Sequence, residues 1–186
     1  DDTLDGGAGN DSVVGNVGND SLIGGVDSDT LFGNAGNDII SDGSGNDTVD
    51  GGAGSDTITL GSGDDSVIAG ADADQVTVAD ANFDANDTIT GGTGTDTLTF
   101  TDAATVAGAD FPNVSCVEVF EFNASGNSAV ISDAMVQSTD AGTSIELDNN
   151  ANTISSLDTS DVSATRDVVI GGAGTVTLAD GVNSRV

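Results

Sequence analysis

The chain has 186 residues and a formal net charge of −30, because 32 Asp and Glu side chains face only two Arg, with no Lys and no His. Charge of this sign argues against binding to nucleic acid or to an anionic membrane surface. Hydrophobic residues make up 36% of the chain but aromatic residues only 3%, so any core must be aliphatic and thin. The acids need positive charge from outside the chain, or the chain stays expanded.

No run of apolar residues approaches the roughly 18 needed to span a bilayer, so we expect no membrane insertion. The first residues, DDTLD, resemble the end of a repeat already under way, without an initiator Met or a signal-peptide pattern. We therefore expect the sequence to be a fragment or processed product of a longer chain. The single cysteine, Cys116, can form no internal disulfide, and its apolar neighbours favour a small buried hydrophobic residue.

An aspartate recurs every nine residues from Asp2 to Asp74, and after a four-residue insertion the spacing resumes at Asp87 and Asp96. An aliphatic residue stands two positions after each aspartate, from Leu4 to Leu98. A disordered acidic segment has no reason to keep an apolar position in phase, so this is a structural repeat. The aspartates, which we number position 6 of the repeat, are Asp2, Asp11, Asp20, Asp29, Asp38, Asp47, Asp56, Asp65, Asp74, Asp87 and Asp96.

Glycine keeps the same phase as the aspartates. Positions 1 and 2 are mostly Gly or Asn and position 4 is mostly Gly, which are residues that accept a positive φ at low cost. Positions 1 to 6 therefore predict a turn with inward-facing carbonyl groups, and positions 7 to 9 a very short strand. Departures from glycine mark the turns that fit the repeat least well, and we expect the Asp74 turn to bind weakly or not at all. They are Asp27, Asp72 and Ala85 at position 4, and Asp42, Leu60 and Ala69 at position 1.

Stacked in register, such short strands form a solenoid with 18 residues per coil and a continuous apolar column. Consecutive repeats then face opposite edges, with aspartates about 4.8 Å apart along each edge, where bare carboxylates would repel. A cation between them turns repulsion into attraction, and oxygen ligands without His or Cys favour calcium over zinc, copper or magnesium. One edge carries Asp11, Asp29, Asp47 and Asp65, and the other carries Asp2, Asp20, Asp38, Asp56 and Asp74.

The segments GGAGNDSVV, GNVGNDSLI, GNAGNDIIS and GGAGSDTIT resemble the calcium-binding nonapeptide G-G-x-G-x-D-x-U-x of RTX proteins. The resemblance covers residues 1 to 99, and the regular array ends near Thr77. It implies a parallel β-roll in which each calcium ion lies between turns two repeats apart.

The resemblance also implies a ligand set. One ion takes Asp11 and Asp29 with the carbonyls of Gly7, Gly9, Gly24 and Val26. Further turn carbonyls come from Gly18, Gly36, Gly45, Gly52, Gly54 and Gly63, and Asp87 and Asp96 belong to the same metal-binding set. The other pairs are Asp2/Asp20, Asp20/Asp38, Asp29/Asp47, Asp38/Asp56, Asp47/Asp65 and Asp56/Asp74, which gives about seven Ca²⁺ ions.

The array is interrupted between residues 78 and 90. Asp80, Asn82, Asp84 and Asn86 alternate there like the start of an EF-hand loop. The glycine of such a loop would fall on Ala85 and its terminal acid on Gly91, which argues against an EF-hand. A local calcium site or a bulged coil fits the segment better.

Beyond residue 100 the nine-residue repeat stops and glycine becomes rarer. Strands are expected over 96–101, 114–122, 143–148, 167–172 and 175–180, and a helical turn over 132–137. Their spacing of about twenty residues predicts an all-β chain, with a β-roll over 1–99 and wider parallel β-helix-like coils over 100–186. Residues 91–122 also resemble segments that follow nonapeptide arrays in bacterial surface-layer proteins and large secreted adhesins.

Nothing in the sequence argues for an enzyme. The GxGxxG matches lie inside nonapeptide turns, and Glu118, Glu121 and Glu146, which a paired-carboxylate glycosidase could use, are expected to be solvent-facing strand residues. The leading hypothesis is a calcium-dependent structural segment of a secreted bacterial surface layer or coat, folding after type I export. Its partners would be copies of itself and cell-surface polysaccharide. The alternatives are an RTX adhesin, with the roll as spacer, and the secretion and folding module of a secreted hydrolase.

Overall fold

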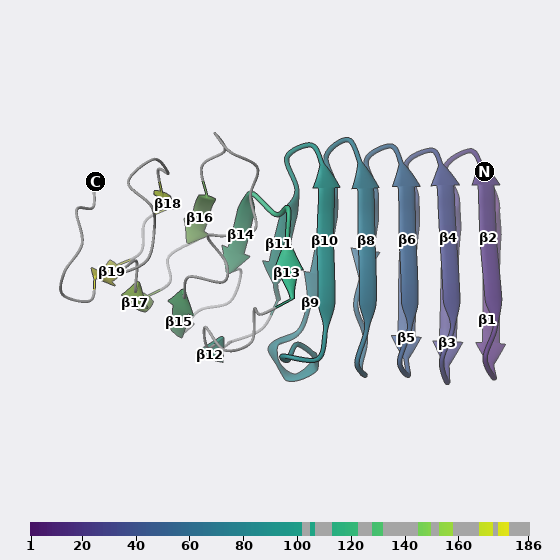
Figure 1. The fold of residues 1–186 in the computed structure, drawn as a ribbon, viewed down its shortest axis with the longest axis horizontal. Coiled ribbons are helices and arrows are strands. Elements are labelled where there is room, and N and C mark those ends of the chain that lie inside the picture. The colour runs from purple at the N-terminus through teal and green to yellow at the C-terminus, as the bar shows by residue number, and fades with distance from the viewer. Residues whose placement is uncertain are drawn as a thin grey trace.

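A computed structural model describes the backbone of residues 1–101, 105–106, 113–122, 128–131, 145–149, 153–157, 168–172 and 175–178. Within these residues the chain winds as a solenoid of stacked coils, with strands of successive coils side by side along its longest axis (Figure 1). Every strand pair is parallel, as the sequence predicts. No helix among the described residues is long and apolar enough to cross a membrane.

Alternate strands build two facing sheets. The odd-numbered sheet contains β1 (Thr3–Ala8), β3 (Ser21–Val26), β5 (Ile39–Ser44), β7 (Thr57–Thr59), β9 (Gln75–Val78), β11 (Thr97–Phe100), β14 (Val119–Phe122), β16 (Ile145–Asn149) and β18 (Val168–Gly172). The facing sheet contains β2 (Ser12–Val17), β4 (Thr30–Ala35), β6 (Thr48–Ala53), β8 (Ser66–Ala71), β10 (Thr88–Thr93) and β13 (Val114–Ser115). A third group contains β12 (Thr105–Val106), β15 (Ser128–Ile131), β17 (Thr153–Leu157) and β19 (Thr175–Leu178).

The core is the aliphatic column at position 8, which is enclosed between the two facing sheets. Its side chains are stacked 18 residues apart, so that Leu4 pairs with Leu22 and Leu22 with Ile40. Each buried Val, Leu or Ile contributes about 1.5–3 kcal/mol by leaving water. The fully buried members are Leu22, Leu31, Ile40, Val49, Ile58, Val67, Ile89 and Leu98, each at most 1% exposed.

The strands of the roll are longer than the sequence predicts. We expected three residues per strand, at positions 7 to 9, but β1 to β6 each contain six. The extra residues are turn positions 1 to 3, whose backbone pairs with the next coil, as Gly7 does with Gly25 and Ala8 with Val26. Exact 18-residue stacking gives these glycines a partner strand although they have little strand propensity of their own.

The interruption is a bulged coil. It contains the short 3-10 helix η1 (Asp80–Asn82), and its four extra residues bring Phe83 into the core, where Phe83 is 6% exposed. The Phe83 ring meets Phe100 edge to face, with 5.3 Å between ring centroids. An aromatic contact thus fills the space that opens when a coil widens from 18 to 22 residues.

Later coils are wider, which confirms the parallel continuation. Leu98 pairs with Phe120, 22 positions on, and Val119 with Glu146, 27 positions on. The strands expected over 96–101, 143–148, 167–172 and 175–180 are present as β11, β16, β18 and β19, whereas β12, β15 and β17 were not anticipated. The helical turn expected over 132–137 lies outside the described residues. The odd-numbered sheet continues past residue 99, and the domain boundary there stays a prediction.

The single strand expected over 114–122 is wrong. The chain forms β13 in one sheet, turns at Cys116 to Glu118, and continues as β14 in the other. Cys116 takes a positive φ of 54° in this turn, and its side chain is half-buried rather than fully buried. The turn between β13 and β14 could not be predicted from the sequence, because the β propensity is continuous there and no glycine or proline marks the turn.

Candidate calcium sites along the two edges

The position-6 aspartates form a hydrogen-bonded ladder along each edge of the solenoid. The backbone N–H of each aspartate donates to Oδ1 of the aspartate in the next coil on the same edge. We call the two rows edge A and edge B. On edge A the N···O distance is 2.8 Å for Asp11 to Asp29, 2.7 Å for Asp29 to Asp47 and 2.9 Å for Asp47 to Asp65. On edge B the pairs are Asp2/Asp20, Asp20/Asp38, Asp38/Asp56 and Asp56/Asp74, at 2.5 to 2.8 Å.

Both ladders continue where the coils widen. The next steps, Asp65 to Asp87 and Asp74 to Asp96, span 22 residues at 2.9 Å. Edge B then ends on a glutamate, because the Asp96 N–H donates to Glu118 Oε2 at 2.9 Å, also 22 residues on. Glu118 is 7% exposed, so our expectation of a solvent-facing strand residue is wrong for it. The repeated 22-residue spacing is the signal that could have identified Glu118 from the sequence.

Position 5 carries a second ladder that runs the opposite way. Here a side-chain oxygen accepts from the backbone N–H of the following coil, as Asn19 Oδ1 does from Asn37 at 2.9 Å and Asn37 Oδ1 from Ser55 at 3.0 Å. Ser28 Oγ substitutes for an amide in the same role, accepting from Asn46 at 3.1 Å. Each turn is therefore tied to its neighbours in both directions, which fixes the turn carbonyls and carboxylates in place.

The second oxygen of nine ladder carboxylates, and that of Asp42, has no hydrogen-bond partner although it is buried. The atoms concerned are Oδ2 of Asp11, Asp20, Asp29, Asp38, Asp42, Asp47, Asp56, Asp65, Asp74 and Asp96. A buried carboxylate oxygen without a partner costs free energy, and the cost is larger when the group is ionised. These oxygens therefore require either a proton or a cation.

A backbone carbonyl converges with each of these oxygens where position 1 is glycine. A Cβ built on Gly15 would lie 2.8 Å from Asp20 Oδ2 and 2.9 Å from the carbonyl oxygen of Gly33. On edge A, a Cβ on Gly6 would lie 2.7 Å from the Gly24 carbonyl and 3.2 Å from Asp11 Oδ2. The glycine leaves open a space lined by one carboxylate and one carbonyl oxygen, and we call this space the cradle. Hard oxygen donors of this kind fit Ca²⁺.

Burial also controls protonation. It raises the pKa of Asp56 to about 6 and of Asp74 to about 7 on edge B, and of Asp65 to about 6 on edge A. Like-charged ladder neighbours add to this effect, while the backbone N–H donors oppose it. Asp42 has its pKa raised to about 7 by burial and then by the nearby Asp65 carboxylate. Burial likewise raises the pKa of Asp47, Asp87 and Asp96. The fold therefore binds protons strongly where no cation is bound.

The expected carboxylate and carbonyl ligands differ in what they contact in the structure. The aspartates share edges as expected, and the position-1 carbonyl of Gly24 faces Asp11. The position-3 carbonyl of Val26 accepts the Gly9 N–H at 3.3 Å, and the Gly7 carbonyl lies against Gly25 of the next coil. All of these ligand assignments remain predictions.

In the regular array up to Asp74, three position-1 residues depart from glycine, and all are buried. They are Asp42 (0% exposed), Leu60 (3%) and Ala69 (0%). Asp42 is expected from the sequence only as a departure from the position-1 glycine, but its carboxylate lies with those of Asp47 and Asp65. The Cys116 carbonyl, which the sequence does not predict at an edge, is one that a Cβ built on Gly91 would meet together with Asp96 Oδ2.

The bulged coil contains no EF-hand-like arrangement of the described side chains. Asp84 Oδ1 accepts from the Asn86 N–H at 2.7 Å and closes a local turn. Asp87 uses both carboxylate oxygens, one for the Asp65 N–H and one for the Asp84 N–H at 2.8 Å. Asp87 thus differs from the other ladder aspartates, because the bulge supplies a backbone donor to its second oxygen.

Comparison with protein families agrees with the geometry. The RTX calcium-binding nonapeptide repeat matches in four copies, over residues 1–31, 23–58, 41–76 and 83–100. Searches of curated proteins and of solved structures each gave no match. RTX repeats bind Ca²⁺, and proteins that carry them are typically secreted from bacteria. The matched segments cover half of the chain, and the chain therefore belongs to the family of RTX calcium-binding repeat proteins.

Proposed function

We propose that this chain is a calcium-dependent structural segment of a secreted bacterial cell-surface protein, which folds on binding calcium after export. The β-solenoid of RTX repeats is a structural fold that binds calcium. The observation that carries the proposal is the row of buried aspartate oxygens without partners on both edges. At neutral pH the metal-free fold must either hold these carboxylates ionised and unpaired or take up protons, and both options weaken it.

Each ion stabilises the fold because only the folded chain brings two coils together around it. A site bound by the folded state alone adds RT ln(1 + [Ca]/Kd), about 2.7 kcal/mol at a hundredfold excess over Kd. Several such sites exceed the typical stability of a domain, about 5–15 kcal/mol. In our proposal the ions lie between the seven expected aspartate pairs, from Asp2/Asp20 to Asp56/Asp74.

This dependence suits export. Where calcium is scarce, inside the cell, repulsion among the acids keeps the chain unfolded and able to pass a type I secretion channel. Outside, calcium folds the roll over residues 1–99, and the wider coils over 100–186 continue it as a second region. Assembly with further copies into a surface layer or coat would follow on the cell surface, with cell-surface polysaccharide as a second partner.

The test is circular dichroism of the purified chain in millimolar Ca²⁺ and in excess chelator at pH 7.5, with Mg²⁺ at the same concentration as control. We expect strong β structure only with Ca²⁺. Equal β content in calcium and in chelator would overturn the metal-coupled folding.

Electron microscopy of the calcium-bound protein tests the surface-coat part separately. Ordered sheets or tubes support a coat, whereas a monomer that binds glycans contradicts the coat and favours an adhesin. Neither result affects the folding claim.

A further inference from the structure

Asp42 occupies a position where the repeat places glycine, and its side chain points into the roll. Glycine stands at the same position 1 in Gly6, Gly24 and Gly33, where it leaves the cradle open. The Asp42 side chain is 0% exposed and lies on edge A beside the ladder carboxylates Asp47 and Asp65. A side-chain carboxylate has therefore replaced open space in one cradle of the roll.

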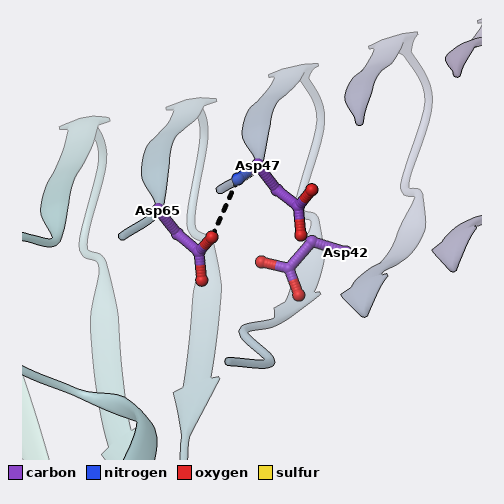
Figure 2. Close-up of side chains that lie close together, drawn as sticks. All are labelled: Asp42, Asp47 and Asp65. Carbon is purple, nitrogen blue, oxygen red and sulfur yellow. Dashed lines mark hydrogen bonds between the residues drawn. The ribbon is translucent and has the colours of Figure 1, made fainter. Parts of the chain in front are cut away.

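The three carboxylates form a tight group. One oxygen from each of Asp42, Asp47 and Asp65 lies within 4.8 Å of the other two. Figure 2 shows the carboxylates of Asp42 and Asp47 close together, with Asp65 on the adjacent coil, bonded to the Asp47 backbone N–H. Among the described residues no other three acids meet this criterion.

Backbone donors hold each carboxylate by one oxygen only. Asp42 Oδ1 accepts from the N–H groups of Gly43 at 2.6 Å and Gly61 at 2.7 Å, and Asp47 Oδ1 accepts from Asp29 at 2.7 Å. The Oδ2 atoms of Asp42, Asp47 and Asp65 are buried without any hydrogen-bond partner. Three clustered side chains, each at most 2% exposed, thus each carry one buried oxygen that no hydrogen bond satisfies.

We propose that Asp42, Asp47 and Asp65 form one cation site of a composition that the nonapeptide does not encode, with higher affinity for trivalent cations than the other sites. This inference rests on the proposed calcium-dependent fold. Asp42 adds one negative charge to the expected Asp47/Asp65 site, so this site carries one carboxylate more than the other sites and favours an ion of higher charge. The extra charge has a large effect on cation affinity because the site is buried, where an unbalanced charge is poorly screened.

The neighbouring residues fit a single enlarged site. Leu60 takes position 1 of the following turn and is 3% exposed, so an apolar side chain stands there in place of an open glycine cradle. Gly61 lacks the positive φ that Gly43 takes at the equivalent position, and its N–H, like that of Gly43, donates to Asp42 Oδ1. The next turn on edge A, which contains Leu60 and Gly61, thus packs directly against the Asp42 carboxylate.

The experiment is a titration of the calcium-loaded chain with LaCl₃ by isothermal calorimetry at pH 7.5, in the wild type and three variants. Asp42→Asn keeps the shape but removes the charge, and Asp42→Gly restores the residue found in most turns. Asp50→Asn is the matched control, because it removes one charge from the adjacent strand β6 outside the cluster. We expect one La³⁺ equivalent to bind at least about tenfold more tightly than the rest in the wild type and in Asp50→Asn. Both Asp42 variants should lose that equivalent.

The outcomes separate the two proposals. A wild-type chain that neither binds Ca²⁺ nor changes fold with it contradicts the proposed function. A chain that folds with Ca²⁺ but has no tight La³⁺ class, or keeps it in Asp42→Asn, overturns only the site. Retention in Asp42→Asn would mean that Asp42 acts as a neutral acid, since Asn imitates that form. Circular dichroism in Ca²⁺ confirms that each variant is folded, and Asp42→Gly serves if Asp42→Asn is not.

Discussion

The two edges of the roll share their aspartates but differ at position 1. Edge B has glycine or alanine there throughout, as Gly15, Gly33, Gly51, Ala69 and Gly91. Edge A begins with Gly6 and Gly24 and then changes to Asp42 and Leu60. The ladder hydrogen bonds are the same on both edges, at 2.5 to 2.9 Å.

The comparison separates two roles within one repeat. Position 6 supplies the carboxylate and ties successive coils together, so it stays constant along both edges. Position 1 decides what stands beside the ladder carboxylate of its turn: Gly15 leaves an open cradle, whereas Ala69 and Asp42 place a buried side chain at the same position. Edge B is therefore a row of similar turns, whereas on edge A the position-1 residue is no longer glycine from the third turn, at Asp42, onward.

The largest expected effect tests what both edges share, namely the protonation of buried aspartates. The pKa is raised from the ordinary aspartate value of 3.8 to about 7 for Asp42 and about 6 for Asp65 on edge A, and to about 6 for Asp56 and about 7 for Asp74 on edge B. A raised pKa stabilises the folded state fully below the unfolded pKa, and this contribution is lost as pH rises through 6 to 7. Each pKa unit is worth on the order of 1 kcal/mol.

The calcium-stripped chain should therefore fold at about pH 4.5 and lose its β structure by about pH 7.5. Circular dichroism across this range measures the transition, and the same series in saturating Ca²⁺, which should stay folded throughout, is the control. A stripped chain with equal β content at both pH values would show that unpaired carboxylates do not limit folding on either edge.

The sequence was sufficient for the architecture because the repeat is exact. Aspartate at position 6 and an aliphatic at position 8 fix an 18-residue coil, two edges and a thin core, and Leu22 and Ile40 lie one above the other as that pattern requires. The extent of the strands could not be read in the same way, since Gly7 and Ala8 are in a strand only because the next coil pairs with them.

The sites were less predictable than the fold because the role of a single residue depends on its burial and on its neighbours in the folded chain. In the sequence, Asp42 is only a departure from the position-1 glycine. Its burial beside Asp65 in the structure shows that its carboxylate lies inside the roll. Glu118 was expected to be a solvent-facing strand residue, because its place in the ladder depends on a 22-residue coil, which the nonapeptide spacing does not predict. Cys116 supplies a carbonyl, a backbone contribution that side-chain identity does not predict.

The next largest effect is expected from Asp38→Ala, in the middle of edge B. The substitution leaves the Asp20 N–H without its acceptor at 2.7 Å and removes the free oxygen between two coils. We expect a loss of about 3–5 kcal/mol of unfolding free energy in Ca²⁺, measured by urea denaturation. Asp29→Ala should cost about as much on edge A, because it also lies beside a position-1 glycine.

The control for these variants is Asp50→Ala, which removes an acid from strand β6 outside the ladder. It should change the unfolding free energy by less than about 1 kcal/mol. Equal losses for Asp38→Ala and Asp50→Ala would contradict the ladder scheme. A much smaller loss for Asp29→Ala would show that the two edges already differ at their glycine turns.

The smallest effect, and the most direct test of position 1, comes from exchanging glycine and alanine on edge B. Gly33→Ala places a methyl group against Asp38 Oδ2 and the Gly51 carbonyl, so it should remove one calcium equivalent. Ala69→Gly opens the cradle beside Asp74 and should tighten calcium binding there several-fold, although glycine costs the metal-free fold about 0.5–1 kcal/mol. Calcium titration calorimetry counts the equivalents in both variants. If Gly33→Ala keeps every equivalent and Ala69→Gly gains no affinity, position 1 does not control the sites, and the difference between the edges lies in the Asp42 cluster alone.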